Sequence, residues 1–259
     1  MPKFAANISM LFPERELLDR IDAAATVGFR AVECQSPYKV PAAEFAARLR
    51  ACRVSCVLIN TPPGEGDADR GFAAIRGRET DFMASLERAL DYAAAIGCTR
   101  IHTLAGRVAP DRASEALFVA NLQRGADRAA ELGITLLLEP LNGQDNPGYF
   151  LGTTGAAIAL LDRIGRPNVK LQFDFYHCQI TEGGLAAHVE RLLPSIGHVQ
   201  FAGVPGRHEP DRGEINYPFL FDLLDRLGYA GWVAAEYRPA AGTLEGLGWA
   251  RPWGIGAVP

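Results

Sequence analysis

The sequence predicts a single α/β domain folded as a (β/α)₈, or TIM, barrel with an irregular C-terminal tail. Two observations lead to this prediction. Short apolar runs rich in β-branched residues alternate with helical patterns along the chain, which is typical of βαβ units and a parallel sheet. There are eight such runs in 259 residues, and a barrel of eight βα units typically needs about 250 residues.

The eight predicted strands are spread along the whole chain. They cover residues 4–8, 29–34, 55–60, 99–105, 134–141, 169–175, 196–202 and 231–237. Between them, apolar residues recur with a period of about 3.6, which predicts amphipathic helices. These helical patterns cover residues 16–28, 42–52, 82–97, 115–133, 156–165 and 218–228.

Glycines punctuate this alternation. Glycine closes a helix readily because it adopts left-handed backbone angles without a Cβ clash. Each of six glycines follows an apolar helix end and precedes a predicted strand: Gly28, Gly97, Gly133, Gly165, Gly197 and Gly228. A doubly wound open sheet is the competing fold, but it usually has a glycine-rich phosphate loop after its first strand. Residues 8–14 (ISMLFPE) contain no glycine, so the barrel is favoured.

The last predicted strand is followed by a segment rich in glycine, GTLEGLGWARPWGIGAVP (242–259). We expect one short helix there and then an irregular end. Trp249 and Trp253 are expected to pack on the barrel or on a second subunit. Because no linker is evident, residues 1–259 are expected to form one domain.

The composition is that of an ordinary globular protein, with 48% hydrophobic and 22% charged residues. A formal net charge of -4 disfavours nucleic acid as a partner, because domains that bind phosphate backbones usually carry a basic excess. Neither a membrane span of about 18 apolar residues nor a signal peptide is predicted. The five cysteines are irregularly spaced, so we expect reduced thiols and a cytoplasmic location.

Four predicted strands end in side chains suited to metal binding, namely Glu139, Asp174, Gln200 and Glu236. Their separations of 35, 26 and 36 residues match one βα unit each. One such carboxylate alone would be explained by a cap or an ion pair, but four equivalent positions favour a shared partner. The carboxyl ends of barrel strands surround one mouth, so the four can converge on one ion. Oxygen ligands favour Mg²⁺ or Mn²⁺.

Three histidines also lie near these strand ends. His198 precedes Gln200 by two residues, so it shares the same face deeper in the barrel and is expected to be a core or supporting residue. His177 lies just beyond the sixth strand, where it can reach substrate oxygens. His102, on the fourth strand, is expected to point inward.

Several long motifs resemble those of the hydroxypyruvate isomerase family. They are FAANISMLF (4–12), DRGFAAIRGRE (69–79), EPLNGQDNPGY (139–149), QFDFYH (172–177), GHVQFAGVPGRHEPDRGEINY (197–217) and GWVAAEYRP (231–239). The resemblance covers nearly the whole chain. More widely, the chain is similar to the xylose-isomerase-like barrels, which include ketose 3-epimerases, inosose dehydratases and the endonuclease IV group.

The resemblance implies roles for individual residues. Glu139, in the EPLN motif, and Glu236, in the EYRP motif, would bind the metal and act as the catalytic acid/base pair. Asp174 and Gln200 stand at the other two metal positions, where the related epimerases have His in place of Gln200. Positions at or near substrate-contacting residues of those relatives are occupied by Asp145, His177 and Arg207.

A substrate that carries a carboxylate needs a cationic pocket. Arg207 is the leading candidate because it follows the seventh strand, and Arg70, Arg78 and Arg212 are further candidates. The chain departs from the family in two loops of the first half, at residues 33–38 (ECQSPY) and 61–70, the latter being shortened. Both departures bear on substrate identity more than on chemistry.

These residues suit an aldose–ketose isomerisation through an enediolate, with hydroxypyruvate and tartronate semialdehyde as the expected pair. One glutamate would remove the α-proton and the other would return it to the adjacent carbon, while the metal stabilises charge on the substrate oxygens. The alternatives are an isomerase of a four-carbon 2-oxo acid (2-oxo-tetronate type), a ketose 3-epimerase and, more weakly, an endonuclease IV-like metallohydrolase. A non-catalytic sugar-binding barrel would not need the paired carboxylates. The expected partner is a small hydroxy-oxo acid substrate. Neither nucleic acid nor a membrane is expected as a partner, and assembly into a homo-oligomer is left open.

Overall fold

The computed structural model describes residues 1–64 and 69–256, and in this part of the chain it shows the predicted closed barrel. Eight parallel strands follow one another in sequence order, and β1 pairs with β8 to close the ring. Each overlaps one predicted run. The strands are β1 Lys3–Asn7, β2 Ala31–Cys34, β3 Ser55–Asn60, β4 Arg100–His102, β5 Thr135–Leu138, β6 Val169–Asp174, β7 Ile196–Phe201 and β8 Trp232–Ala235.

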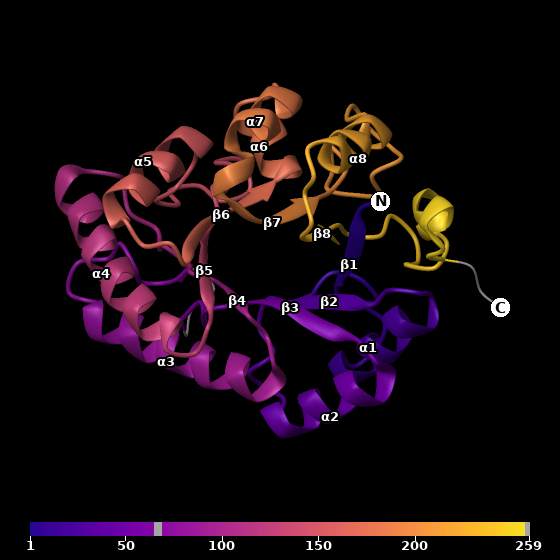
Figure 1. Ribbon diagram of the computed structural model, residues 1–259, viewed down its shortest axis with the longest axis horizontal. Helices are drawn as coiled ribbons and strands as arrows, with labels where there is room; N and C mark the ends of the chain where they lie inside the picture. The colour runs from indigo at the N-terminus through magenta and orange to yellow at the C-terminus, as the bar shows by residue number, and fades with distance from the viewer. Residues whose placement is uncertain (65–68, 257–259) are drawn as a thin grey trace.

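The helices form an outer ring around the strands (Figure 1). They are α1 Leu17–Thr26, α2 Ala42–Cys52, α3 Glu79–Ile96, α4 Arg112–Ala130, α5 Thr154–Ile164, α6 Phe175–Thr181, α7 Leu185–Leu192 and α8 Tyr217–Arg226, with the 3₁₀ helices η1 Leu193–Ser195 and η2 Leu247–Trp253. Side-chain caps start several of them; the Asp111 carboxylate, for example, accepts a hydrogen bond from the Ser114 amide at the start of α4. Among the described residues, no helix has the length and apolar character that a membrane span requires.

Five of the six predicted helix-ending glycines have the positive φ that such an end favours, from 60° at Gly165 to 105° at Gly28. The prediction for Gly197 was wrong, because this residue lies inside β7. A Cβ at Gly197 would lie 2.7 Å from Lys170 Cβ and 2.7 Å from Leu137 Cδ2. Glycine is therefore required there by the close approach of neighbouring side chains, not by a helix end.

The barrel interior is layered. A small apolar cluster, formed by Ala5, Ala31, Val57 and Ala234, lies apart from the main core. Since alternate residues of a strand face the same side, the positions two residues further along β1, β2 and β8 also face inward. These positions are Asn7, Glu33 and Glu236, and all three are buried. The interior thus changes from apolar to polar toward the carboxyl ends of the strands.

The main hydrophobic core fills the space between strands and helices. It includes an aromatic cluster centred on Phe4, whose ring centroid lies 4.9–5.9 Å from those of Phe201, Phe221, Trp249 and Trp253. The two tryptophans come from the short helix η2 in the tail, so both the predicted helix and its packing on the barrel are confirmed. All five cysteines are free thiols, as expected. In the loop 61–70, which was predicted to be shortened, residues 65–68 lie outside the described residues.

Candidate active site

The four predicted strand-end residues all lie buried at the carboxyl ends of their strands. Asp174 ends β6 and pairs in register with Gln200 of β7. Glu139 and Glu236 directly follow β5 and β8. None of the four is more than 5% exposed. Because a barrel places these ends around one mouth, three carboxyl groups are held close together away from water.

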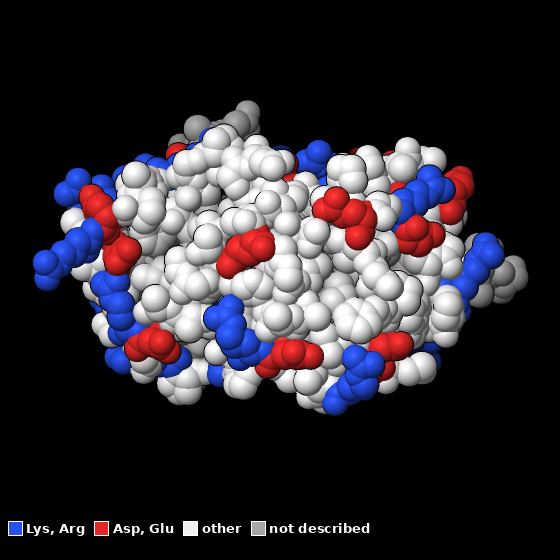
Figure 2. All heavy atoms as spheres, turned by 90° about the horizontal axis from the view of Figure 1, so that it is seen from above, with Lys and Arg blue, Asp and Glu red and all other residues white. Residues whose placement is uncertain are grey.

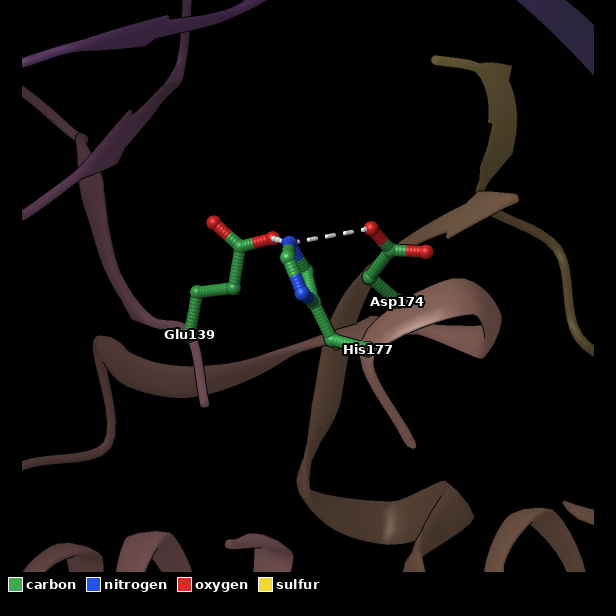
Figure 3. Close-up of side chains that lie close together, drawn as sticks. All are labelled: Glu139, Asp174 and His177. Atoms are coloured by element: carbon green, nitrogen blue, oxygen red, sulfur yellow. Dashed lines mark ion pairs between the residues drawn. The ribbon is translucent and has the colours of Figure 1, made fainter. Parts of the chain in front are cut away.

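Glu139, Asp174 and His177 form a group in which one ligand atom of each lies within 4.8 Å of the others. His177, in the first turn of α6, directs Nε2 between the two carboxylates, 4.0 Å from Glu139 Oε1 and 3.6 Å from Asp174 Oδ2 (Figure 3). Glu139 Oε1 is buried and has no hydrogen-bond partner among the described residues. A cation bound here would satisfy this unpaired acceptor.

The hydrogen bonds of His177 define which of its nitrogens carries the proton. Nδ1 accepts from the Asn142 amide at 3.1 Å and faces Asn142 Nδ2 at 2.7 Å. The Asn142 side chain cannot be turned round, since its Oδ1 accepts from the Asp145 amide at 2.9 Å. Burial lowers the pKa of His177 well below its usual value, so the ring is neutral and Nε2 carries the hydrogen. His177 is therefore built to donate a hydrogen bond, and a metal here would rely on carboxylate oxygens.

Gln200, the predicted fourth ligand, is engaged elsewhere. Its Nε2 donates to Glu33 Oε1 at 2.7 Å, and its Oε1 accepts from Gln172 Nε2 at 2.5 Å. The closely spaced group leaves Glu139 and Asp174 as the carboxylates that could hold a cation, while Glu236 is paired with Arg207. Such a pair has the all-oxygen character that Mg²⁺ and Mn²⁺ prefer.

Arg207 neutralises part of this negative charge. Its Nη2 lies 2.6 Å from Glu236 Oε2 and 3.4 Å from Asp174 Oδ2. The guanidinium also stacks over the Tyr176 ring, with 4.8 Å to the centroid. Arg207 itself has φ 57°, a left-handed angle that is uncommon for a side chain of this size. The Arg207 side chain bridges two of the strand-end carboxylates.

The carboxyl groups have perturbed acidities. Burial raises the pKa of Glu236 to about 8 against the opposing charge of Arg207. Burial likewise raises the pKa of Asp174 to about 6. The pKa of Glu139 is raised well above its usual value by burial and by the charges of Glu236 and Asp174. Carboxyl groups with raised pKa values are suited to taking up and releasing protons near neutrality.

The other predicted residues lie at different distances from this centre. His102 is buried, with Nδ1 3.1 Å from Glu139 Oε2. Asp145 accepts from the Tyr176 hydroxyl at 2.7 Å. His198 is fully buried and lies 2.7 Å from Glu33 through its Nε2, in the supporting position expected for it. Arg70 is exposed, and no hydrogen bond or ion pair joins it to the strand-end carboxylates within the described part of the chain.

Sequence reasoning did not assign a site role to Asn7, Glu33, Gln35 or Asn142. Asn7 Nδ2 and Gln35 Nε2 donate to Glu236 Oε1 at 3.0 Å and 2.6 Å. A signal was present for Glu33, since it is a charged residue in the middle of the apolar run 29–34. For Asn7 and Gln35 the sequence carries no local signal.

Comparison with known proteins identifies the family. Residues 21–253 match the family model described as Xylose isomerase-like TIM barrel. The chain is 51% identical over 257 residues to a 2-oxo-tetronate isomerase of Cupriavidus necator, covering 98% of this chain and 99% of that protein. It is 40% identical over 257 residues to the hydroxypyruvate isomerase of Escherichia coli, covering 98% and 100%.

A solved structure agrees with this fold throughout. The crystal structure described as AP endonuclease, family 2, from Brucella melitensis superposes with a TM-score of 0.96 at 44% identity, covering 98% of this chain and 99% of that one. The predicted resemblance to hydroxypyruvate isomerases is therefore confirmed. The chain belongs to the xylose isomerase-like TIM barrel family.

Proposed function

We propose that this protein is an isomerase that moves a hydrogen between C3 and C2 of a short 2-oxo-3-hydroxy acid, interconverting it with the 2-hydroxy-3-oxo acid. Hydroxypyruvate and tartronate semialdehyde are the three-carbon pair. The observation that supports this most is the pair of buried glutamates, Glu139 and Glu236, with raised pKa values at one barrel mouth. Relatives over the full chain length carry names of this reaction class.

The proton transfer needs one group that removes the C3 proton and another that delivers a proton to C2. Glu139 and Glu236 supply these two groups from non-adjacent strands, and the neutral Nε2–H of His177 can donate to a substrate oxygen whose charge increases in the enediolate. The net change is that C3–H and O3–H are lost while C2–H and O2–H are formed. A divalent cation held by the carboxylate oxygens would stabilise the charge on these substrate oxygens.

Arg207 supports an acid as the substrate. A guanidinium pairs well with carboxylates through parallel hydrogen bonds, and the Arg207 side chain, at 13% exposure, reaches the mouth. Arg207 can therefore hold the substrate carboxylate while it screens Glu236 and Asp174. This role of Arg207 favours an acid substrate over a free ketose, because a free ketose has no charged group for Arg207 to bind.

The four-carbon 2-oxo-tetronate is the second candidate substrate, because the relative with 51% identity carries that name. Both acids share the C2–C3 chemistry and differ by one hydroxymethyl group. Steady-state turnover with each acid tests the proposal. We expect kcat/KM to be higher for one of the two acids than for any free ketose; turnover of ketoses alone would contradict it.

A hydrolase acting on DNA is less well supported, although the Brucella melitensis structure is described as an AP endonuclease. In the described residues, the single cluster of three mutually close ligand side chains contains one histidine. The face in Figure 2 carries scattered basic and acidic side chains among neutral ones, without a continuous basic stripe. A surface for nucleic acid carries such a stripe, and this face does not provide one.

A further inference from the structure

Glu33 is a buried acid to which neither the sequence motifs nor the proposed proton transfer gives a role. It lies on β2, only 1% exposed, at a point where the pairing with β3 shifts register. Such irregularities redirect side chains next to functional sites. The Glu33 side chain faces the barrel interior, one layer above Ala31, where an unpaired carboxylate would be strongly unfavourable.

Three hydrogen bonds hold the Glu33 carboxylate. Oε1 accepts from Asn7 Nδ2 at 2.8 Å and from Gln200 Nε2 at 2.7 Å. Oε2 lies 2.7 Å from His198 Nε2. The donors come from β1 and β7, so Glu33 joins strands that are not neighbours in the ring. Both carboxylate oxygens are used, and an amide at this position could accept through only one of them.

The orientation of the Asn7 amide is fixed independently. Asn7 Oδ1 accepts from the backbone N–H of Ser9 at 3.0 Å, so its NH₂ group must face the carboxylates. One hydrogen points to Glu33 Oε1 at 2.8 Å and the other to Glu236 Oε1 at 3.0 Å. Asn7 therefore links Glu33 directly to one of the two proposed proton-transfer groups and uses both of its hydrogens to do so.

We propose that Glu33 is a positioning residue, which acts through Asn7 to hold Glu236 in the orientation needed for proton transfer. This inference rests on the proposed function for its kinetic consequence, but its structural part concerns Glu236 alone. Among the described residues, Asn7 donates a hydrogen bond to Glu236 and none to Glu139, so the network serves one proton-transfer group of the pair. Loss of the network should therefore impair one half of the reaction.

This asymmetry gives a readout that general damage to the fold would not produce. In D₂O, the proton-transfer group that acts first can exchange the substrate hydrogen even when the second step fails. In the reaction direction in which Glu139 removes the substrate proton, hydrogen exchange should persist while turnover falls. In the direction in which Glu236 removes it, exchange and turnover should fall together.

The test uses the full-length variants Asn7→Ala and Glu33→Gln, each assayed from both sides of the equilibrium. We expect kcat to fall by about 10–100-fold, as for other residues that orient a reacting group through hydrogen bonds, with KM changed less than threefold. Asn121→Ala is the matched control: Asn121 is equally buried and donates to the Ala73 carbonyl oxygen at 2.9 Å, on the outer side of the barrel. It should leave the ratio of exchange to turnover unchanged from both sides.

Equal loss of exchange from both sides, or no change in kcat, would overturn the inference. A crystal structure of Asn7→Ala provides the measurement that does not depend on substrate. A displaced or multiply oriented Glu236 carboxylate in that structure supports the inference. An unmoved Glu236 carboxylate contradicts the inference. If wild-type protein turns over neither acid, only the proposed function is refuted. If Glu33→Gln does not fold, the inference is tested with Asn7→Ala alone.

Discussion

Replacing Arg207 by methionine tests the electrostatic organisation of the site. Methionine is similar in length and removes the positive charge. Three favourable contacts are lost: the 2.6 Å contact with Glu236 Oε2, the 3.4 Å contact with Asp174 Oδ2, and the stacking on Tyr176. The two carboxylates remain buried, at 4% and 0% side-chain exposure, without this partner.

The magnitude follows from that burial. Removing one partner of a buried ion pair typically destabilises a protein by about 3–5 kcal/mol. We expect the lower end, about 3 kcal/mol, because the contact with Asp174 is long and Glu236 keeps hydrogen bonds from Asn7 and Gln35. For a chain of this size, about 3 kcal/mol lowers Tm by roughly 6–12 °C. Loss of the charged hydrogen bond to the substrate should add about 1.5–3 kcal/mol to the activation barrier in kcat/KM, roughly 10–150-fold.

Denaturant unfolding and steady-state kinetics measure the two effects. Arg166→Met is the matched control, because Arg166 also contacts a carboxylate at 2.6 Å, that of Asp127, but on the surface with 36% and 60% side-chain exposure. Exposed pairs contribute about 0–1 kcal/mol, so this control should remain near wild type in stability and activity. Equal stability losses in the two variants, or an unchanged kcat/KM in Arg207→Met, would refute the assignment of Arg207.

Further predictions concern catalysis, metal and core. Glu139→Gln and Glu236→Gln should each lower kcat by about 10²–10⁴-fold, the usual contribution of general acid–base catalysis, and full turnover in either variant would remove that glutamate from the mechanism. Dialysis against a chelator should abolish activity, and Mg²⁺ or Mn²⁺ should restore it; activity that survives in protein shown by elemental analysis to be metal-free contradicts the metal proposal. Phe221→Ala, at a 1% exposed position of the aromatic cluster, should cost about 3–5 kcal/mol in unfolding free energy with KM unchanged, and a wild-type unfolding midpoint would show that the cluster does not stabilise the barrel.

The barrel could be predicted from the sequence because its signals are local. Apolar runs and helical periodicity lie within single segments, and five of the glycines end helices through their own backbone angles. Gly197 follows the apolar segment of α7 and η1 in the same way, so its pattern resembles a helix end. Its actual role depends on the side chains of Lys170 and Leu137, which reach it from β6 and β5. Contacts of this kind leave no trace in the local pattern.

The strand-end residues were likewise accessible because equivalent positions of successive repeats converge in a barrel. The network around Glu33 was not. Its hydrogen bond to His198 spans 165 residues and that to Gln200 spans 167. Nothing in the run 29–34 tells which strand supplies the partners of a buried acid. The hydrogen bonds of Gln200 to Glu33 and Gln172 occupy both polar atoms of a side chain that stands at a metal-type position.

The position of solvent deuterium in the product tests the central claim most directly. Purified protein supplied with Mg²⁺ would convert hydroxypyruvate, and separately 2-oxo-tetronate, in D₂O, with the products followed by NMR. Proton transfer by two glutamates predicts deuterium at C2 of the 2-hydroxy-3-oxo product, since the hydrogen removed from C3 and the hydrogen added at C2 pass through different carboxyl groups. A product with ordinary hydrogen at C2, carried over from C3, would show a direct hydride shift and contradict the proposed roles of Glu139 and Glu236.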